Sequence, residues 1–402
     1  MTDQAPHPGT ANNISAQAKP PPWNDPVVRS VVFQIVAIIC IGGFFWYILD
    51  NTLTNMAKRG ITTGFKFLNT EAGFGILMSL IEYDESHSYG RTFVVGLLNT
   101  VLVSFLGIIL ATIIGFIIGI ARLSNNWLIA KIATVYIEVL RNIPLLLQIF
   151  FWYIAVLQTL PALRQSIMLG DSFFLNNRGF YMPRPVFGDG FEFVTAAIII
   201  AIVAIVYFRR WAHKRQDETG HQYHVFYISL GILIGLPLVI FLAVGMPLNF
   251  EIPKLSRFRF EGGARIIPEL MALLWALTMY TAAFIAEIVR SGIQAVSHGQ
   301  SEAAHALGMR NGPTLRLVII PQAMRVIIPP LTSQYLNLTK NSSLATAIGY
   351  PDLVSVFMGT TLNQTGQAVE VVAMTMAVYL TISLSISYVM NCYNRKVALV
   401  ER

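Results

Sequence analysis

Charged residues are scarce in this chain of 402 residues. Asp, Glu, Lys and Arg make up 12% of the sequence, and hydrophobic residues make up 54%. A soluble globular protein carries about a quarter of its residues as charges. So few charges cannot cover an ordinary soluble fold with polar surface, and we predict an integral membrane protein.

Cysteine is nearly absent, and the usual marks of an enzyme are missing. Cys40 and Cys392 lie in or beside apolar segments at opposite ends of the chain, so a structural disulfide is not expected. The seven histidines are isolated, and the spacing of His213, His221 and His224 matches no metal-ligand pattern. We expect no catalytic residue, no metal and no cofactor bound by this chain.

Two binding signatures are also missing. The sequence contains no Gly-Lys pair, which excludes a phosphate-binding loop of the form Gly-x4-Gly-Lys-Ser/Thr. If ATP drives this protein, the ATPase is therefore another chain. The net charge of +7 is not gathered in a dense basic run, so Lys and Arg flanking membrane spans explain it and nucleic acid is not an expected partner.

Apolar stretches recur along the whole sequence. About 20 apolar residues suffice to cross a bilayer as a helix. We predict an all-α integral membrane protein with about eight transmembrane helices, and treat 161–192, 209–215 and 247–266 as connecting loops. The predicted spans are 31–49, 93–121, one that the segment 136–148 leads into and that ends near Leu160, 193–208, 225–246, 270–286, 326–338 and 371–390.

The topology follows from the charged flanks. Residues 1–27 are polar and Pro-rich, which is typical of a disordered tail. With both termini in the cytoplasm, the basic cluster 209–215 and the tail residues Arg395 and Lys396 fall inside, as the positive-inside rule asks. The loop 247–266 disagrees, because it carries four cations on the outside.

A ridge of small residues marks the second predicted span. Gly107, Ala111, Gly115 and Gly119 recur every four residues in a run of 29 residues without charge. Small side chains on one face let a second helix approach closely. We predict that this face packs against another span.

The longest polar interruption in the second half of the chain is residues 292–325. Ser301 is predicted to cap a short helix that starts with Glu302, Ala303 and Ala304. Gly308 is placed to end that helix in a left-handed conformation. Asn311 then restarts the chain, and Pro321 breaks it as the membrane resumes. Such a short exposed helix is suited to docking in a groove of another protein.

These residues carry a family resemblance. Glu302-Ala303-Ala304, then Gly308, then Ile319-Ile320-Pro321 resembles the EAA loop of ABC-importer permeases, the cytoplasmic coupling helix that sits on the ATPase subunit. Its flanks, 281–290 and 340–344, and the Arg-x-x-Pro-Leu segment that starts at Arg141 are similar to permeases for polar amino acids.

The resemblance implies a type I ABC-importer permease core with an inserted helix pair. We expect residues 1–27 to be a cytoplasmic tail, 28–93 an extra N-terminal span and external loop, and 393–402 a second cytoplasmic tail. The permease domain is then 94–392, with an insertion at 161–265.

The resemblance also implies partners and a location. We expect ABC ATPase subunits that use ATP and Mg, a second related permease that makes a heterodimer, and an extracytoplasmic amino-acid-binding protein. The location that the resemblance implies is the inner membrane of a Gram-negative bacterium. An ion-coupled secondary carrier is the alternative, and a membrane enzyme is the third reading.

Polar residues near the seventh span are candidates for a substrate path. Pro329 and Pro330 are expected to break that span, and its polar groups must then face protein or a water-filled route. The alternative is that Lys340 anchors at the outer interface and the others pack helices. The candidates are Arg141, Gln148, Thr281, Gln334, Asn337, Lys340, Asn341 and Ser342.

Overall fold

The computed structural model describes residues 25–58, 63–257 and 259–397. The chain divides into two units, Met1–Gly64 and Phe65–Arg402. Within the described residues, seven helices are long and apolar enough to cross a membrane, and a bent helix pair raises this to up to eight. The prediction of a mostly helical membrane protein with about eight spans is confirmed.

In its described residues the first unit contains one long helix, α1 (Pro26–Lys58), which contains the predicted span 31–49. Most of the predicted disordered tail lies outside the described residues, and its end already belongs to α1. The C-terminal tail differs in a similar way, because α12 (Ala368–Val397) continues five residues past Cys392 and only 398–402 fall outside.

The centre of the second unit is the contact between α2 (Tyr89–Arg122) and α7 (Pro268–Gln294). The predicted small-residue ridge of α2 makes this contact. A Cβ atom built on Gly115 would lie 2.6 Å from the Cβ of Ile285, and one on Gly119 would lie 2.7 Å from the carbonyl oxygen of Ala286. Only glycine permits this approach, so the prediction of a packing face is confirmed.

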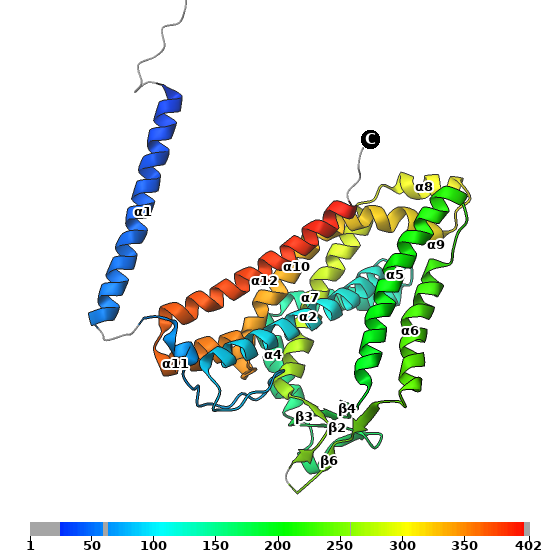
Figure 1. The fold of residues 1–402 in the computed structure, drawn as a ribbon. Coiled ribbons are helices and arrows are strands. Elements are labelled where there is room, and N and C mark those ends of the chain that lie inside the picture. The colour runs from blue at the N-terminus through cyan, green and yellow to red at the C-terminus, as the bar shows by residue number, and fades with distance from the viewer. Residues whose placement is uncertain (1–24, 59–62, 258, 398–402) are drawn as a thin grey trace, which may run out of the picture. The chain divides into compact units, whose positions relative to one another are not determined.

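The C-terminal half of the bundle packs against this pair (Figure 1). Helix α10 (Ile320–Asn341) lies against α7 and α12, and its Leu338 contacts the ridge at Gly107. The remaining connections are short helical segments: η1 (Phe65–Asn69), η5 (Ser342–Ile348), the π-helical η6 (Val354–Thr361) and α11 (Leu362–Thr365).

The predicted third span is broken. Helix α3 (Trp127–Asn142) is followed by α4 (Leu145–Phe150) and the π-helical η2 (Phe151–Leu157), and the two parts meet at 105°. The bend falls at Ile143 and Pro144, because the residue before a proline is pushed out of the helical region. The predicted span that ends near Leu160 is therefore the second part of a bent helix pair.

Two predicted loops contain β-strands that the sequence analysis missed. A four-stranded sheet has the order β1-β2-β3-β8, and two further pairs are β4-β5 and β6-β7. All pairings are antiparallel, with Tyr181 opposite Arg265 and Phe187 opposite Leu248. The strands are β1 (Ile167–Leu169), β2 (Phe173–Asn176), β3 (Gly179–Met182), β4 (Arg184–Phe187), β5 (Leu248–Glu251), β6 (Lys254–Leu255), β7 (Phe260–Glu261) and β8 (Ala264–Ile266).

A helix pair leaves this sheet region and returns to it. Helix α5 (Phe191–Thr219) and helix α6 (Val225–Ala243) pack chiefly against each other, to one side of the bundle (Figure 1). The basic residues 209–215 were predicted to be a loop, but they form the last turns of α5. The connection from α5 to α6 is the short segment after Gly220. Helix α5 simply extends its hydrogen bonding beyond the apolar region.

We expect Gly115→Leu to lower stability strongly, because its side chain would have to displace Ile285 and separate α2 from α7. Overpacking of this kind costs about 1–3 kcal/mol or more. Thermal unfolding of the purified protein measures it. Gly231→Leu in α6 is the matched control, since a Cβ there meets no described atom within 4 Å. Equal losses in both variants would contradict the close-contact argument.

Candidate coupling loop and polar path

The polar interruption forms two short helices between α7 and α10. Helix α8 (His298–Ala306) follows Ser297, and α9 (Asn311–Thr314) follows Arg310. The predicted cap at Ser301 is wrong, because α8 starts one turn earlier. Ser297 is also a good capping residue, so the sequence offered two starts of the same type.

The end of α8 is the predicted left-handed turn. Gly308 has a φ of +77°. Its N–H donates to the carbonyl of His305 at 2.8 Å, and the N–H of Met309 donates to the carbonyl of Ala304 at 3.1 Å. This pair of bonds is the Schellman arrangement, which satisfies the last carbonyls of a helix. The turn therefore redirects the chain while the carbonyls of Ala304 and His305 keep hydrogen-bond partners.

A break at Pro321 was predicted, but the helix continues through this residue. It runs through a π-helical turn, η4 (Leu315–Ile319), directly into α10. In a π-helix a carbonyl bonds to the N–H five residues later. This shift in hydrogen bonding accommodates Pro321, which has no N–H to donate. Pro329 and Pro330 likewise lie inside the continuous α10, so the predicted break of the seventh span is also wrong.

One face of α8 is open. Glu302 and Ala303 are exposed, whereas Ala304 is 4% exposed and packs inward. Leu307 is 82% exposed at the tip of the loop. A hydrogen bond links α8 to α10, since the Gln322 amide donates to Oε1 of Gln300 at 3.1 Å. The loop thus presents a surface of small residues and a leucine.

An ion-pair cluster lies where α7 leads into this loop. Glu287 bonds Arg122 at the end of α2 and also accepts from Nε of Arg290 at 3.2 Å. Arg122 lies 3.8 Å from Glu138 of α3 as well. The side chains of Glu287, Arg122 and Arg290 are only 19–27% exposed. The cluster joins three helices, and the spacing of Glu287 and Arg290 produces the pair along the helix that the sequence suggests.

The candidate path residues of α10 share a face. Gln334, Asn337 and Asn341 follow one another at helical spacing, and all three are at least partly exposed. Ile327, Leu331 and Leu338 of the same helix are buried in the core. A polar stripe of this length on an apolar bundle is therefore open on the surface of the single chain.

Lys340 is exposed, but Ser342 is not part of the open stripe. Ser342 is buried, and its hydroxyl donates to the carbonyl of Thr339 at 2.7 Å. This bond caps the end of α10 locally. The sequence placed both residues in one motif because they are close in the chain, whereas the helix turns them to different sides.

Three other candidate residues lie on other helices of the bundle. The Arg141 guanidinium lies 5.1 Å from the centre of the Phe284 ring. The Gln148 amide donates to the carbonyls of Leu140 and Ile143 at 2.9 Å and so satisfies the backbone at the bend after α3. Thr281 is buried in α7. The geometry thus gives Gln148 a structural task and separates it from the α10 stripe.

A buried polar cluster was missed by the sequence analysis. The Asn99 amide of α2 donates to the carbonyl of Pro351 at 2.9 Å, and the Tyr350 hydroxyl donates to the carbonyl of Asn99 at 3.1 Å. The Tyr379 hydroxyl of α12 donates to Asp352 at 3.3 Å, and burial raises the pKa of this carboxyl group to about 7. The available signal was Asn99, a lone amide in an uncharged span.

We expect Glu287→Gln to destabilise the protein by about 1–3 kcal/mol, because it removes a charged acceptor shared by two arginines. Thermal unfolding provides the measurement. Glu302→Gln is the control with the same chemical change, since the Glu302 side chain is 78% exposed and lies 3.9 Å from His298. An exposed pair of this kind contributes little. A Glu287→Gln protein as stable as the control would show that the cluster adds nothing.

The sequence is similar to known transport proteins. The family described as binding-protein-dependent transport system inner membrane component matches residues 222–399. The protein YhdX of Escherichia coli (strain K12) is 56% identical over 378 residues, covering 94% of this chain and 96% of its own.

Two further relatives have informative names. The general L-amino acid transport system permease protein AapQ of Rhizobium johnstonii is 53% identical and covers 94% of each chain. The glutamate/glutamine/aspartate/asparagine transport system permease protein BztB of Rhodobacter capsulatus is 43% identical, over 93% of this chain and 95% of its own. The chain belongs to the amino-acid ABC transporter permeases, multi-pass proteins of the inner membrane with the type I importer fold.

Proposed function

We propose that this chain is the transmembrane subunit of an ATP-driven, binding-protein-dependent importer of L-amino acids. The observation that carries the proposal is the exposed face of α8, with Glu302 and Ala303 outward and a left-handed turn at Gly308, in an amino-acid ABC permease. This face docks on a separate ATPase subunit, which binds ATP and Mg. Hydrolysis then moves the loop, and the permease itself catalyses no reaction.

The connections of α8 explain how such a movement reaches the membrane. On one side a short segment, 295–297, joins α8 to α7. On the other side α9, η4 and α10 form one continuous helical run, so a push on the loop acts on α10 directly. The Glu287 cluster fixes α7 to α2 and α3 at the same end. The loop therefore moves helices and not only itself.

A second permease subunit completes the path. The stripe Gln334, Asn337 and Asn341 is polar and open, and polar groups at membrane depth need protein or water around them. A related subunit facing α10 would enclose a route lined by these amides, with Lys340 and Ser342 near one end and Arg141 and Thr281 outside the stripe. We propose a heterodimer, with both termini and α8 in the cytoplasm.

The substrates follow from the relatives' names and from the chemistry of the stripe. AapQ is named for general L-amino acids, and BztB for two acidic amino acids and their amides. Amides such as Gln334 and Asn337 can donate and accept hydrogen bonds, so they suit polar ligands without demanding one charge. We propose broad uptake of L-amino acids, with selection made by an extracytoplasmic binding protein.

An ion-coupled carrier is the competing function. It would share the polar stripe but would not need the exposed α8 face. Transport that continues when ATP hydrolysis is blocked, while a proton or sodium gradient is kept, would favour the carrier.

We expect Gly308→Val to abolish most uptake and ATPase co-purification while the protein still inserts, because a β-branched residue at a φ of +77° costs about 1–2 kcal/mol and reshapes the turn. Gly308→Asn is the matched control, since Asn tolerates the left-handed region. No described atom lies within 4 Å of a Cβ at this position, so only backbone strain differs. Normal uptake in the Val variant would refute the assignment of α8.

We expect uptake of several acidic and polar L-amino acids by the assembled transporter, and none without the binding protein. Radiolabelled uptake into vesicles that contain ATP measures both. Exclusive transport of a sugar, phosphate or metal would refute the substrate class. Transport of one single amino acid would refute only its breadth.

A further inference from the structure

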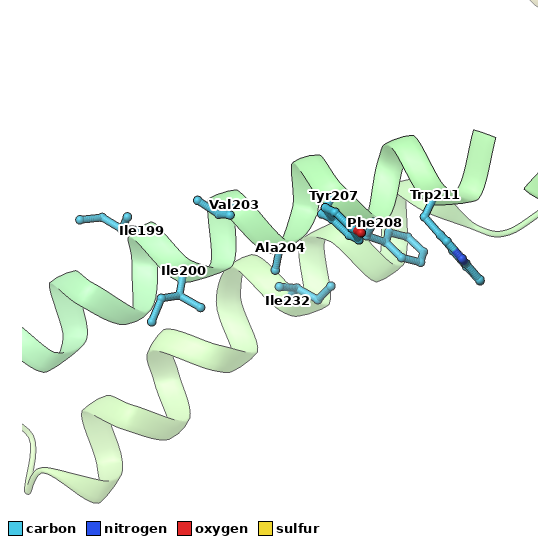
Figure 2. A pocket seen from close by; sticks show the side chains of 8 residues that line it. All are labelled: Ile199, Ile200, Val203, Ala204, Tyr207, Phe208, Trp211 and Ile232. Carbon is cyan, nitrogen blue, oxygen red and sulfur yellow. The ribbon is translucent and has the colours of Figure 1, made fainter. Parts of the chain in front are cut away.

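An apolar groove runs along the α5–α6 pair (Figure 2). It has a volume of about 640 Å³. Its lining side chains are nearly all large and apolar, and most come from α5. They are Ile199, Ile200, Val203, Ala204, Tyr207, Phe208, Trp211 and Ile232. The groove is open along its length, and α5 and α6 contact chiefly each other, so the bundle does not fill it.

The dimensions of the groove fit a lipid chain. From Ile199 to Trp211 the helix rises about 18 Å at 1.5 Å per residue. One leaflet of a bilayer contributes about half of a hydrocarbon thickness of roughly 30 Å. One extended acyl chain therefore has the length and the polarity of this groove.

The size of the lining side chains argues against a second helix as the occupant. Close helix packing in membranes relies on small residues at the contact. Ala204 is the single small residue among the eight that line the groove. The α2–α7 contact of this same chain, made through Gly115 and Gly119, shows the alternative arrangement.

The groove ends at aromatic rings and cations. Trp211 is 43% exposed and lies 5.2 Å from the ring of Tyr223, beyond the end of α5. Aromatic rings of this kind mark the membrane interface. Lys214 and Arg215 follow Trp211 by three and four residues, so they lie on the same face of α5, one turn further on. Both are exposed.

The charge balance at this end favours an anion. The last turns of α5 carry Arg209, Arg210, Lys214 and Arg215 against Asp217 and Glu218. Lys214 lies 3.8 Å from Glu218, a weak exposed pair that leaves Arg215 as the freest cation beside the groove. The α5–α6 turn also lies at the end of the bundle where α8 lies, opposite the strands (Figure 1).

We propose that the α5–α6 pair is a binding site for an anionic phospholipid of the membrane. One acyl chain lies in the groove from Ile199 to Trp211, and the phosphate headgroup lies at Lys214 and Arg215. Anionic headgroups gain about 1 kcal/mol from each nearby Lys or Arg, which is the complement that this end of α5 offers. Neither the chain nor the headgroup alone would use both halves of the site.

The test is a lipid titration of the purified full-length protein, read by native mass spectrometry. The probes are phosphatidylglycerol and phosphatidylcholine with the same acyl chains, and glycerol phosphate as a headgroup without chains. We expect tighter binding of phosphatidylglycerol than of phosphatidylcholine, and no displacement by glycerol phosphate. Arg215→Gln should weaken phosphatidylglycerol binding about fivefold.

Arg209→Gln is the matched control. It removes the same charge but lies two residues before Trp211, on the opposite face of α5. It should leave the affinity unchanged. Equal weakening by both substitutions would show diffuse electrostatic attraction to the basic end of α5 and contradict a defined headgroup site. Equal binding of the two phospholipids would overturn the proposed headgroup contact.

A second measurement tests where the acyl chain lies. Phosphatidylglycerol with brominated acyl chains should quench the fluorescence of Trp211, measured as the difference between the wild-type protein and Trp211→Phe. An unquenched Trp211 at saturating lipid would place the chain elsewhere and overturn the proposal. So would a disulfide cross-link from Tyr207→Cys to another transporter subunit, because a protein helix would then fill the groove.

Discussion

The close contact of α2 with α7 is the interaction on which the rest of the bundle depends. Gly115 and Gly119 bring the backbone of α2 to within van der Waals distance of Ile285, Ala286 and Val289. Around this contact, α7 positions the core of α10 on one side and leads into α8 on the other. Helices in a membrane have little hydrophobic drive to associate, so packing at such a contact has to supply the stability.

The second constraint is that backbone groups need partners wherever a helix is interrupted. At the bend after α3 the Gln148 amide satisfies two carbonyls. At Pro321 a π-helical turn shifts the hydrogen bonding instead. The end of α8 uses the two bonds around Gly308. Each interruption has its own solution, which allows a mostly helical bundle to contain sharp changes of direction.

The sequence predicted the features that depend on short spacing and local conformation. The spans, the α2 ridge and the left-handed Gly308 each follow from residues within a few turns of one another. The strands did not follow, because they are only two to four residues long and some of them pair across long intervals, such as Tyr181 with Arg265. The same limit explains why the Arg122–Glu287 pair and the Asn99 cluster were missed, since their partners are 165 and 252 residues apart. Ser301 and Pro321 failed for another reason. Both residue types suit a helix boundary, but α8 already begins after Ser297, and a π-helical turn lets the helix continue through Pro321.

The β4–β5 pairing has a consequence for the architecture of the chain. Phe187 and Leu248 face each other across this pair, and residues 188–247, which include α5 and α6, lie between them. In an antiparallel pair such partners are about 5 Å apart. A tight turn could therefore close the chain at this point while the strand pair and the other helices kept their places. The helix hairpin thus leaves and rejoins the rest of the chain at a single point, the β4–β5 pair.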